Sequence, residues 1–187
     1  MRKRRFWHNV AVLFAMASLV ACSGDTIVSN RYSTLMAYFS YSPVSAVSQL
    51  YTACNSMGEW TTITARNSQY VFSNLTGSTP VNRLALQNYS SFYLGLSGLI
   101  VGLPTIPELG ATVPVITCYD LACSNCYHDR NVTKPLTLQT GGRAYCASCQ
   151  RTYDLNNIGQ IASGNAGINL YRYRVYYGNN TLTVNNR

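Results

Sequence analysis

Four cysteines with a regular spacing constrain this chain more than any other feature. They form two pairs, "CSNC" at 123–126 and "CASC" at 146–149, in the pattern Cys-x2-Cys-x19-Cys-x2-Cys. Two such pairs that face each other supply a tetrahedron of thiolates, with Zn–S bonds of about 2.3 Å. The spacing therefore predicts a metal or cluster site formed by Cys123, Cys126, Cys146 and Cys149. Disulfides within or between the pairs are the alternative, which an oxidising compartment would favour.

The remaining cysteines and the nearby histidine have simpler interpretations. Cys54 and Cys118 lie in apolar segments, so we expect them to be buried as small hydrophobic side chains. A Cys54–Cys118 disulfide is the alternative for an exported protein. His128 follows Cys126 by two residues, but four thiolates already complete a closed site. We expect His128 to be an exposed turn residue, or at most a hydrogen-bond donor to a ligand.

The first residues of the chain are typical of an export signal. The basic segment "MRKRRFWHN" precedes the apolar run "VAVLFAMASLVA", whose 12 residues are too few to cross a bilayer. The run leads into Cys22, and this order resembles the lipobox of bacterial lipoproteins, whose cysteine carries the lipid. The resemblance implies a signal peptide over 1–21 and a lipidated tether over 22–36. The alternative is a plain signal peptide with an incidental cysteine.

Lipidation at Cys22 would anchor the protein to a membrane through acyl chains, without a transmembrane helix. Ser23 follows the cysteine and is compatible with the outer membrane of a Gram-negative bacterium, again by resemblance to lipoproteins. Loss of the signal also removes four basic residues, so the formal net charge of +8 falls to +4. The remaining charges are scattered without runs, which argues against a nucleic-acid partner.

Short β-strands account for most of the chain that follows. The segments combine β-branched and aromatic residues and are bounded by Gly, Pro and Asn, which predicts an all-β domain. Apolar residues at helical spacing over 44–54 predict one short helix. Strands are predicted within residues 35–42, 59–65, 69–73, 91–104, 113–119, 130–146 and 168–186.

The stretch "YRYRVYY" at 171–177 alternates tyrosine and arginine. A basic and aromatic strand can serve as a stacking platform for single-stranded nucleic acid. We favour a half-buried strand with solvated arginines, because period-two alternation explains the pattern by itself.

The second cysteine pair and the segment after it resemble the second cluster-binding loop of the Rieske family. That loop contains Cys-x-x-His, then an aromatic-Asp pair, and then a glycine-rich turn before a strand. Cys146 occupies the cysteine position, and Tyr153-Asp154 occupies the position of the aromatic-Asp pair. The strand "PVITCYDLAC" is similar to the one that enters the family's first loop. The later positions of the second loop are matched by Gly159, Ile161, Gly164 and Ala166.

This resemblance implies an antiparallel Rieske-like β-sandwich over 37–187, with a zinc-ribbon-like or rubredoxin-like metal-binding subdomain over 118–166. The ligands, however, depart from the family pattern. Asn125 stands where the first histidine belongs, and Cys149 replaces the second. Two histidines define a Rieske centre and raise its potential, so that chemistry does not carry over.

Three occupants suit four thiolates: zinc, a single iron as in rubredoxin, or a [2Fe–2S] cluster with four cysteine ligands. Export through the general secretory route passes an unfolded chain, which cannot carry a preassembled cluster. Zinc can bind when the chain folds outside the cytoplasm. We therefore expect zinc, with iron or [2Fe–2S] as the alternatives.

The sequence favours a role in binding or structure over catalysis. We find no nucleophile paired with a base and no evident pair of carboxylates for acid–base chemistry. Tyr153 can tune a metal centre, although a core tyrosine is the simpler interpretation. We expect a non-enzymatic, lipid-anchored domain that binds an unidentified protein partner. The alternative is an electron-transfer protein with iron or [2Fe–2S] at the four cysteines.

Overall fold

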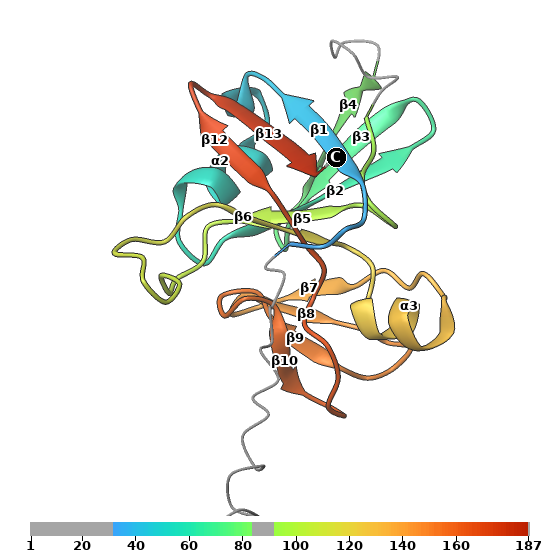
Figure 1. Ribbon diagram of the computed structural model, residues 1–187. Helices are drawn as coiled ribbons and strands as arrows, with labels where there is room; N and C mark the ends of the chain where they lie inside the picture. Colours follow the sequence, from blue (N-terminus) through green and yellow to red (C-terminus); the bar gives the residue numbers. More distant parts are fainter. Residues whose placement is uncertain (1–31, 84–91, 187) are drawn as a thin grey trace, which may run out of the picture. The chain divides into compact units, whose positions relative to one another are not determined.

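The computed structural model describes residues 32–83 and 92–186, which belong to one compact unit, Arg31–Arg187 (Figure 1). Within these residues the chain is built mainly of antiparallel β-strands, which confirms the predicted all-β class. The export signal and Cys22 lie outside the described residues. No helix in 32–83 or 92–186 has the length and hydropathy that crossing a bilayer requires.

A three-stranded sheet joins the two ends of the described chain. Its strand order is β1-β13-β12, and both pairs are antiparallel. The β12–β13 hairpin turns at Asn179 and Asn180, which both have the positive φ that asparagine tolerates. The strands are β1 (Ala37–Tyr41), β12 (Val175–Gly178) and β13 (Thr181–Asn186).

A six-stranded antiparallel sheet forms the middle of the fold, in the order β11-β6-β5-β2-β3-β4. The predicted hairpin is present, because β2 pairs with β3 and Arg66 lies opposite Gln69. The strands are β2 (Trp60–Arg66), β3 (Gln69–Ser73), β4 (Ser78–Asn82), β5 (Leu99–Gly102), β6 (Thr117–Asp120) and β11 (Arg172–Tyr173).

A four-stranded sheet of short strands carries the second cysteine pair. Its order is β10-β9-β8-β7, and each neighbouring pair is antiparallel. The turn between β7 and β8 contains Gly141 and Gly142, both with positive φ, as the Gly-Gly pair predicts. The strands are β7 (Thr137–Gln139), β8 (Arg143–Tyr145), β9 (Thr152–Asp154) and β10 (Gln160–Ser163).

The six-stranded sheet separates two hydrophobic clusters. The first contains Phe39 of β1 and Val184 of β13, together with Leu50 of helix α2 (Ser48–Asn55) and Val101 of β5. The second contains Ile100 of β5, with residues from the four-stranded sheet and the cysteine loops. Successive residues of β5 therefore enter different cores, which explains why the whole strand is buried.

Strands β6 and β11 are antiparallel neighbours, with Arg172 opposite Tyr119 and Tyr173 opposite Cys118. The chain leaves the six-stranded sheet at the end of β6 and returns to it at β11. Everything between these strands, including both cysteine pairs, forms one excursion from the sheet. The two ends of this excursion are held beside each other by backbone pairing.

Two local predictions are wrong. The stretch 171–177 is divided between sheets, since β11 joins the six-stranded sheet and β12 joins the three-stranded one. Arg172 is 7% exposed and forms an ion pair with Glu108, so it is not a solvated arginine. The second difference is helix α3 (Ser124–Arg130), which forms where only a turn was predicted.

The predicted helix over 44–54 is present, divided into a 3-10 turn, η1 (Val44–Ala46), and α2. Leu50 and Cys54 of α2 are buried in the first cluster, as the helical spacing predicts. Cys118 of β6 lies in the same cluster, and both thiols are free. This confirms that Cys54 and Cys118 are buried as small hydrophobic side chains.

Candidate metal centre

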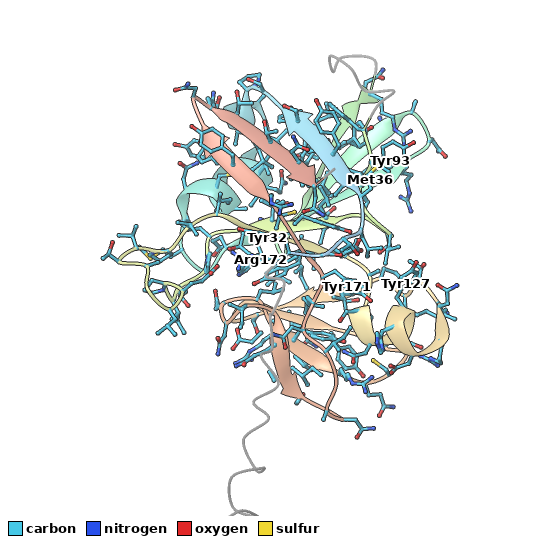
Figure 2. All side chains as sticks on the ribbon, in the orientation of Figure 1. Tyr32, Met36, Tyr93, Tyr127, Tyr171 and Arg172 are labelled. Atoms are coloured by element: carbon cyan, nitrogen blue, oxygen red, sulfur yellow. The ribbon has the colours of Figure 1, made fainter. Side chains whose placement is uncertain are left out.

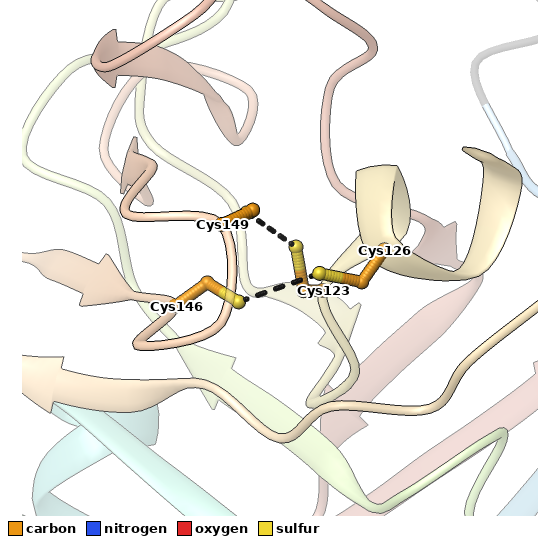
Figure 3. Close-up of side chains that lie close together, drawn as sticks. All are labelled: Cys123, Cys126, Cys146 and Cys149. Carbon is orange, nitrogen blue, oxygen red and sulfur yellow. Dashed lines mark hydrogen bonds between the residues drawn. The ribbon is translucent and has the colours of Figure 1, made fainter. Parts of the chain in front are cut away.

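The four predicted ligands converge on one point between the two cysteine loops (Figure 3). All four Sγ atoms lie within 4.8 Å of one another. The Cys123 and Cys149 sulfurs are 3.5 Å apart, and those of Cys126 and Cys146 are 3.7 Å apart. All four are free thiols without a disulfide bond. The structure thus brings together a donor set that could hold a metal ion.

Helix α3 positions the first pair. Cys123 is the residue just before the helix, and Cys126 lies in its first turn. The backbone N–H of Tyr127 donates to the Cys123 carbonyl, which starts the helix. The N–H of Cys123 donates to the carbonyl of Lys134 at 2.7 Å, which ties the loop to the chain that follows. One helical turn therefore directs both sulfurs toward the same side.

A tight loop between β8 and β9 positions the second pair. The N–H of Gln150 donates to the Cys146 carbonyl at 2.8 Å, and Gln150 has a left-handed φ of 58°. The N–H of Cys146 donates to the Arg151 carbonyl at 2.9 Å, which closes the loop at its base. The loop reverses the chain over few residues, so both sulfurs point inward from adjacent strand ends.

Two arginines place positive charge beside the sulfurs. The Arg130 guanidinium lies 3.1 Å from Cys126 Sγ and 3.2 Å from Ser148 Oγ, so it links the two loops. Arg151 is close to Cys149 in the chain, and its guanidinium donates to the carbonyls of Asn165 and Ala166. Four thiolates around a divalent ion carry excess negative charge, which these two cations would offset.

The thiols differ in how readily they ionise. Burial raises the pKa of Cys123 to about 12, and it also raises the pKa of Cys146. Cys149 is partly exposed; burial raises its pKa, but hydrogen bonds, led by those from Arg151, outweigh this and lower it to about 7. A bound cation would favour the thiolate at every position, because metal ligands must lose their protons.

Tyr153 is buried in the second hydrophobic cluster, as a core tyrosine would be, and it also contacts the site. Its hydroxyl is 3.1 Å from Cys123 Sγ and accepts a hydrogen bond from Asn125 Nδ2 at 2.8 Å. Asn125, only 2% exposed, also donates to the Ile168 carbonyl and accepts from the Ile168 N–H. A Cβ on Gly167 would clash with this amide, so glycine permits the approach. Asn125 thus connects α3, β9 and the segment after β10.

His128 is not among the residues that converge on the site. Its side chain is 61% exposed, and its Nδ1 lies 2.9 Å from the Asp129 carboxylate. This agrees with the prediction of an exposed residue, although His128 lies on α3 rather than in a turn. Arg130 and Arg151 were not predicted from the sequence. Arg130 follows Cys126 by four residues, and this spacing would have revealed it had the helix been predicted.

Comparison of the chain with protein-family models and with curated proteins finds no match.

Proposed function

We propose that Cys123, Cys126, Cys146 and Cys149 bind a single zinc ion that stabilises the fold. The observation that supports this proposal is the compact group of four sulfurs, all within 4.8 Å of one another. A tetrahedral ion with Zn–S bonds of about 2.3 Å spaces its sulfurs about 3.8 Å apart. The contacts of 3.5 Å and 3.7 Å between the two loops agree with that spacing.

A single ion suits this donor set better than a binuclear cluster. In a [2Fe–2S] cluster each iron is held by its own pair of ligands, and bridging sulfides separate the two irons. The two ligand pairs then lie farther apart than they do around one ion. Here no two of the four sulfurs lie more than 4.8 Å apart, so the two ligand pairs are as close as the ligands of one ion.

A closed site of four thiolates supports a structural role. Catalytic zinc keeps an open position for water or substrate, and four protein ligands leave none. The thiolates also occupy the second hydrophobic cluster, since Cys123, Cys126 and Cys146 are buried in it. Zinc would therefore replace disulfides as the cross-link that holds α3 to the β8–β9 loop. We infer a non-enzymatic domain that presents a surface to a protein partner.

Electron transfer through iron is the second candidate. The Tyr153 hydroxyl and the Arg130 guanidinium each contact a ligand sulfur, and such contacts tune the potential of an iron–sulfur site. The partly exposed Cys149 would give electrons a route to the surface. A single iron fits the compact sulfur group better than [2Fe–2S] does.

The surrounding domain is proposed to be Rieske-like over 37–187, with the metal-binding subdomain over 118–166. The sequence resemblance supports this, as does a small sheet of short strands that carries one of the two metal loops. We also propose that Cys22 is lipidated and anchors the domain to a membrane, which places it in the cell envelope.

The metal content of the purified chain tests the function. We expect about one zinc per chain and a colourless protein, measured by elemental analysis together with the visible spectrum. Cys146→Ser should lose most of the zinc, because three thiolates and a hydroxyl bind zinc poorly. Cys54→Ser is the matched control, since Cys54 is also buried but lies in the other cluster.

Iron with red colour and no acid-labile sulfide would favour a rubredoxin-like carrier instead of a structural zinc site. Iron with equal acid-labile sulfide would favour [2Fe–2S] and overturn the single-ion proposal. Equal zinc content in the Cys146→Ser and Cys54→Ser variants would show that the metal lies elsewhere.

A further inference from the structure

A cleft of about 470 Å³ opens beside β11 and β12, and none of the four metal-site cysteines lines it. Cavities of this size are typical of sites for small organic ligands. Tyrosines and one arginine dominate its wall, with apolar residues from the loop between β5 and β6. The residues that matter here are Tyr32, Arg172, Tyr173, Tyr176 and Tyr177.

Arg172 is the charged group of the cleft. Its side chain is only 8% exposed, and it pairs with the Glu108 carboxylate from the β5–β6 loop. Its Nη2 lies 3.5 Å from Thr117 Oγ1, while its buried Nε has no hydrogen-bond partner within residues 32–83 and 92–186. A buried guanidinium requires an anionic partner, and here the fold supplies that partner from a surface loop.

A second arginine makes this end of the cleft positive. The ring of Tyr32 lies 5.5 Å from the guanidinium of Arg172, and both residues are labelled in Figure 2. The guanidinium of Arg174 lies 5.0 Å from the same ring. Arg174 is exposed and forms no ion pair with another described residue; its Nη1 lies 3.4 Å from Asn186 Oδ1. Because Arg174 has no carboxylate partner among the described residues, an additional negative charge is favoured beside Tyr32.

The tyrosines of the cleft indicate what kind of molecule could bind beside the two arginines. Tyr176 is 68% exposed, so part of its ring is open to a ligand. The hydroxyl of Tyr173 is already used, because it donates to Asp120 Oδ2 at 2.5 Å. That of Tyr177 is engaged with Asn55. The rings therefore offer flat apolar surfaces more than free polar groups, and such surfaces stack on planar molecules.

We propose that this cleft binds a small organic acid with a planar apolar body. Its carboxylate binds Arg172 in place of Glu108, and its body packs on Tyr176 and Tyr32. A carboxylate is favoured over a larger anion because the Glu108 carboxylate already fits at Arg172. Glu108 then acts as a built-in competitor that the ligand displaces. The site is separate from the metal centre and does not depend on the occupant of the four cysteines.

Titration calorimetry of the full chain with 2-naphthoate tests the proposal, with 2-naphthamide as the neutral isostere. We expect naphthoate to bind at least about tenfold more tightly than naphthamide, since only the acid carries the charge that Arg172 recognises. Glu108→Gln should bind naphthoate about tenfold more tightly than the unmodified chain, because the competing carboxylate is gone. Its affinity for naphthamide should stay the same.

Tyr176→Ala should weaken naphthoate binding about tenfold, whereas Tyr93→Ala should leave it unchanged. Tyr93 is the matched control because it is 55% exposed and does not line the cleft. Equal affinities for acid and amide, no binding of naphthoate, or equal effects of the two tyrosine variants would overturn the proposal. Should Glu108→Gln fail to fold, the acid-to-amide ratio and the tyrosine pair still decide the outcome.

Discussion

Cys149 differs from the other three cysteines of the metal centre in its surroundings. Its side chain is partly exposed, whereas those of Cys123, Cys126 and Cys146 are buried. Burial raises the pKa of Cys149, but its interactions with Arg151 outweigh this and stabilise the thiolate. Reagents in solution therefore meet this sulfur first when no metal protects it.

The reactivity of Cys149 should follow its lowered pKa. In the metal-free protein we expect alkylation of Cys149 by iodoacetamide to rise with pH around a midpoint near 7, because the thiolate is the nucleophile. Cys54, whose pKa burial raises to about 12, should react far more slowly at every pH below that value. Mass spectrometry of peptides from a pH series measures both rates.

The sign of the associated stability change follows from the same shift. A lowered pKa means that Cys149 contributes stability above its unfolded value of 9.0, and that this contribution is lost as the pH falls through about 7. A Cys149 midpoint near 9, equal to that of an unfolded control, would contradict the proposed role of Arg151. Bound zinc should abolish the reaction at Cys149.

The role of some single residues could be predicted from the sequence, and the role of others could not. The proximity of the four cysteines was predictable, because two Cys-x2-Cys pairs at this spacing are typical of a single four-thiolate site. The role of Asn125 was not, because its partners Tyr153 and Ile168 lie 28 and 43 residues away. Arg172 was predicted to be solvated for the same reason, since the burying partner Glu108 belongs to a distant loop.

Among the elements, α3 is the clearest failure of prediction from periodicity. The helix has seven residues, "SNCYHDR", and its buried residues are Ser124, Asn125 and Cys126. Such a segment has no apolar stripe, because its inner face is made of ligand and hydrogen-bonding groups. The strands β1, β2 and β3 were predictable because they alternate between a core face and a more exposed one.

The end of α3 offers a test at this scale. Asn131 follows the helix with a left-handed φ of 52°, and its N–H donates to the Tyr127 carbonyl at 2.8 Å. Asn131→Ala should lower the free energy of unfolding by about 1 kcal/mol, because alanine is strained in this conformation. Asn131→Gly should preserve or slightly raise it, since glycine adopts positive φ without strain. Urea denaturation of the two variants measures the difference.

Thr133→Ala is a suitable control for both Asn131 variants. Thr133 is exposed two residues beyond the cap, and its loss should change the free energy of unfolding by less than about 0.5 kcal/mol. Should the alanine and glycine variants at 131 have equal stability, the left-handed cap would contribute nothing to the helix.

At the scale of the whole molecule, the two hydrophobic clusters differ in the interactions that stabilise them. The first cluster is large and contains aromatic side chains in contact, such as Phe39 with Tyr70 at a centroid distance of 5.5 Å. The second contains three of the four ligand cysteines and rests on strands of only three or four residues. Metal binding should therefore stabilise the second cluster far more than the first.

Removal of the metal should loosen one half of the fold selectively. With a zinc chelator we expect amide hydrogen exchange to accelerate by at least about tenfold across α3 and β7–β10, because their small core loses its cross-link. Exchange in β1, β13, β2 and β3 should change little, since these strands enclose the first cluster. Exchange measured by mass spectrometry on peptides resolves the two regions.

Uniform acceleration over both regions would mean that the two cores unfold together. Unchanged exchange everywhere would mean that the metal is not structural. Re-addition of zinc, but not of magnesium, should restore the original pattern, because thiolates bind zinc and not magnesium.

The pairing of β6 with β11 has a consequence for how such a fold can change. The excursion that carries the four cysteines departs and returns at adjacent positions, so in topological terms it is an insertion into a β-hairpin. Insertions whose ends lie close together can be gained, lost or exchanged without rebuilding the host domain. The three-stranded and six-stranded sheets can therefore keep their strand pairing while the residues of the inserted part change independently.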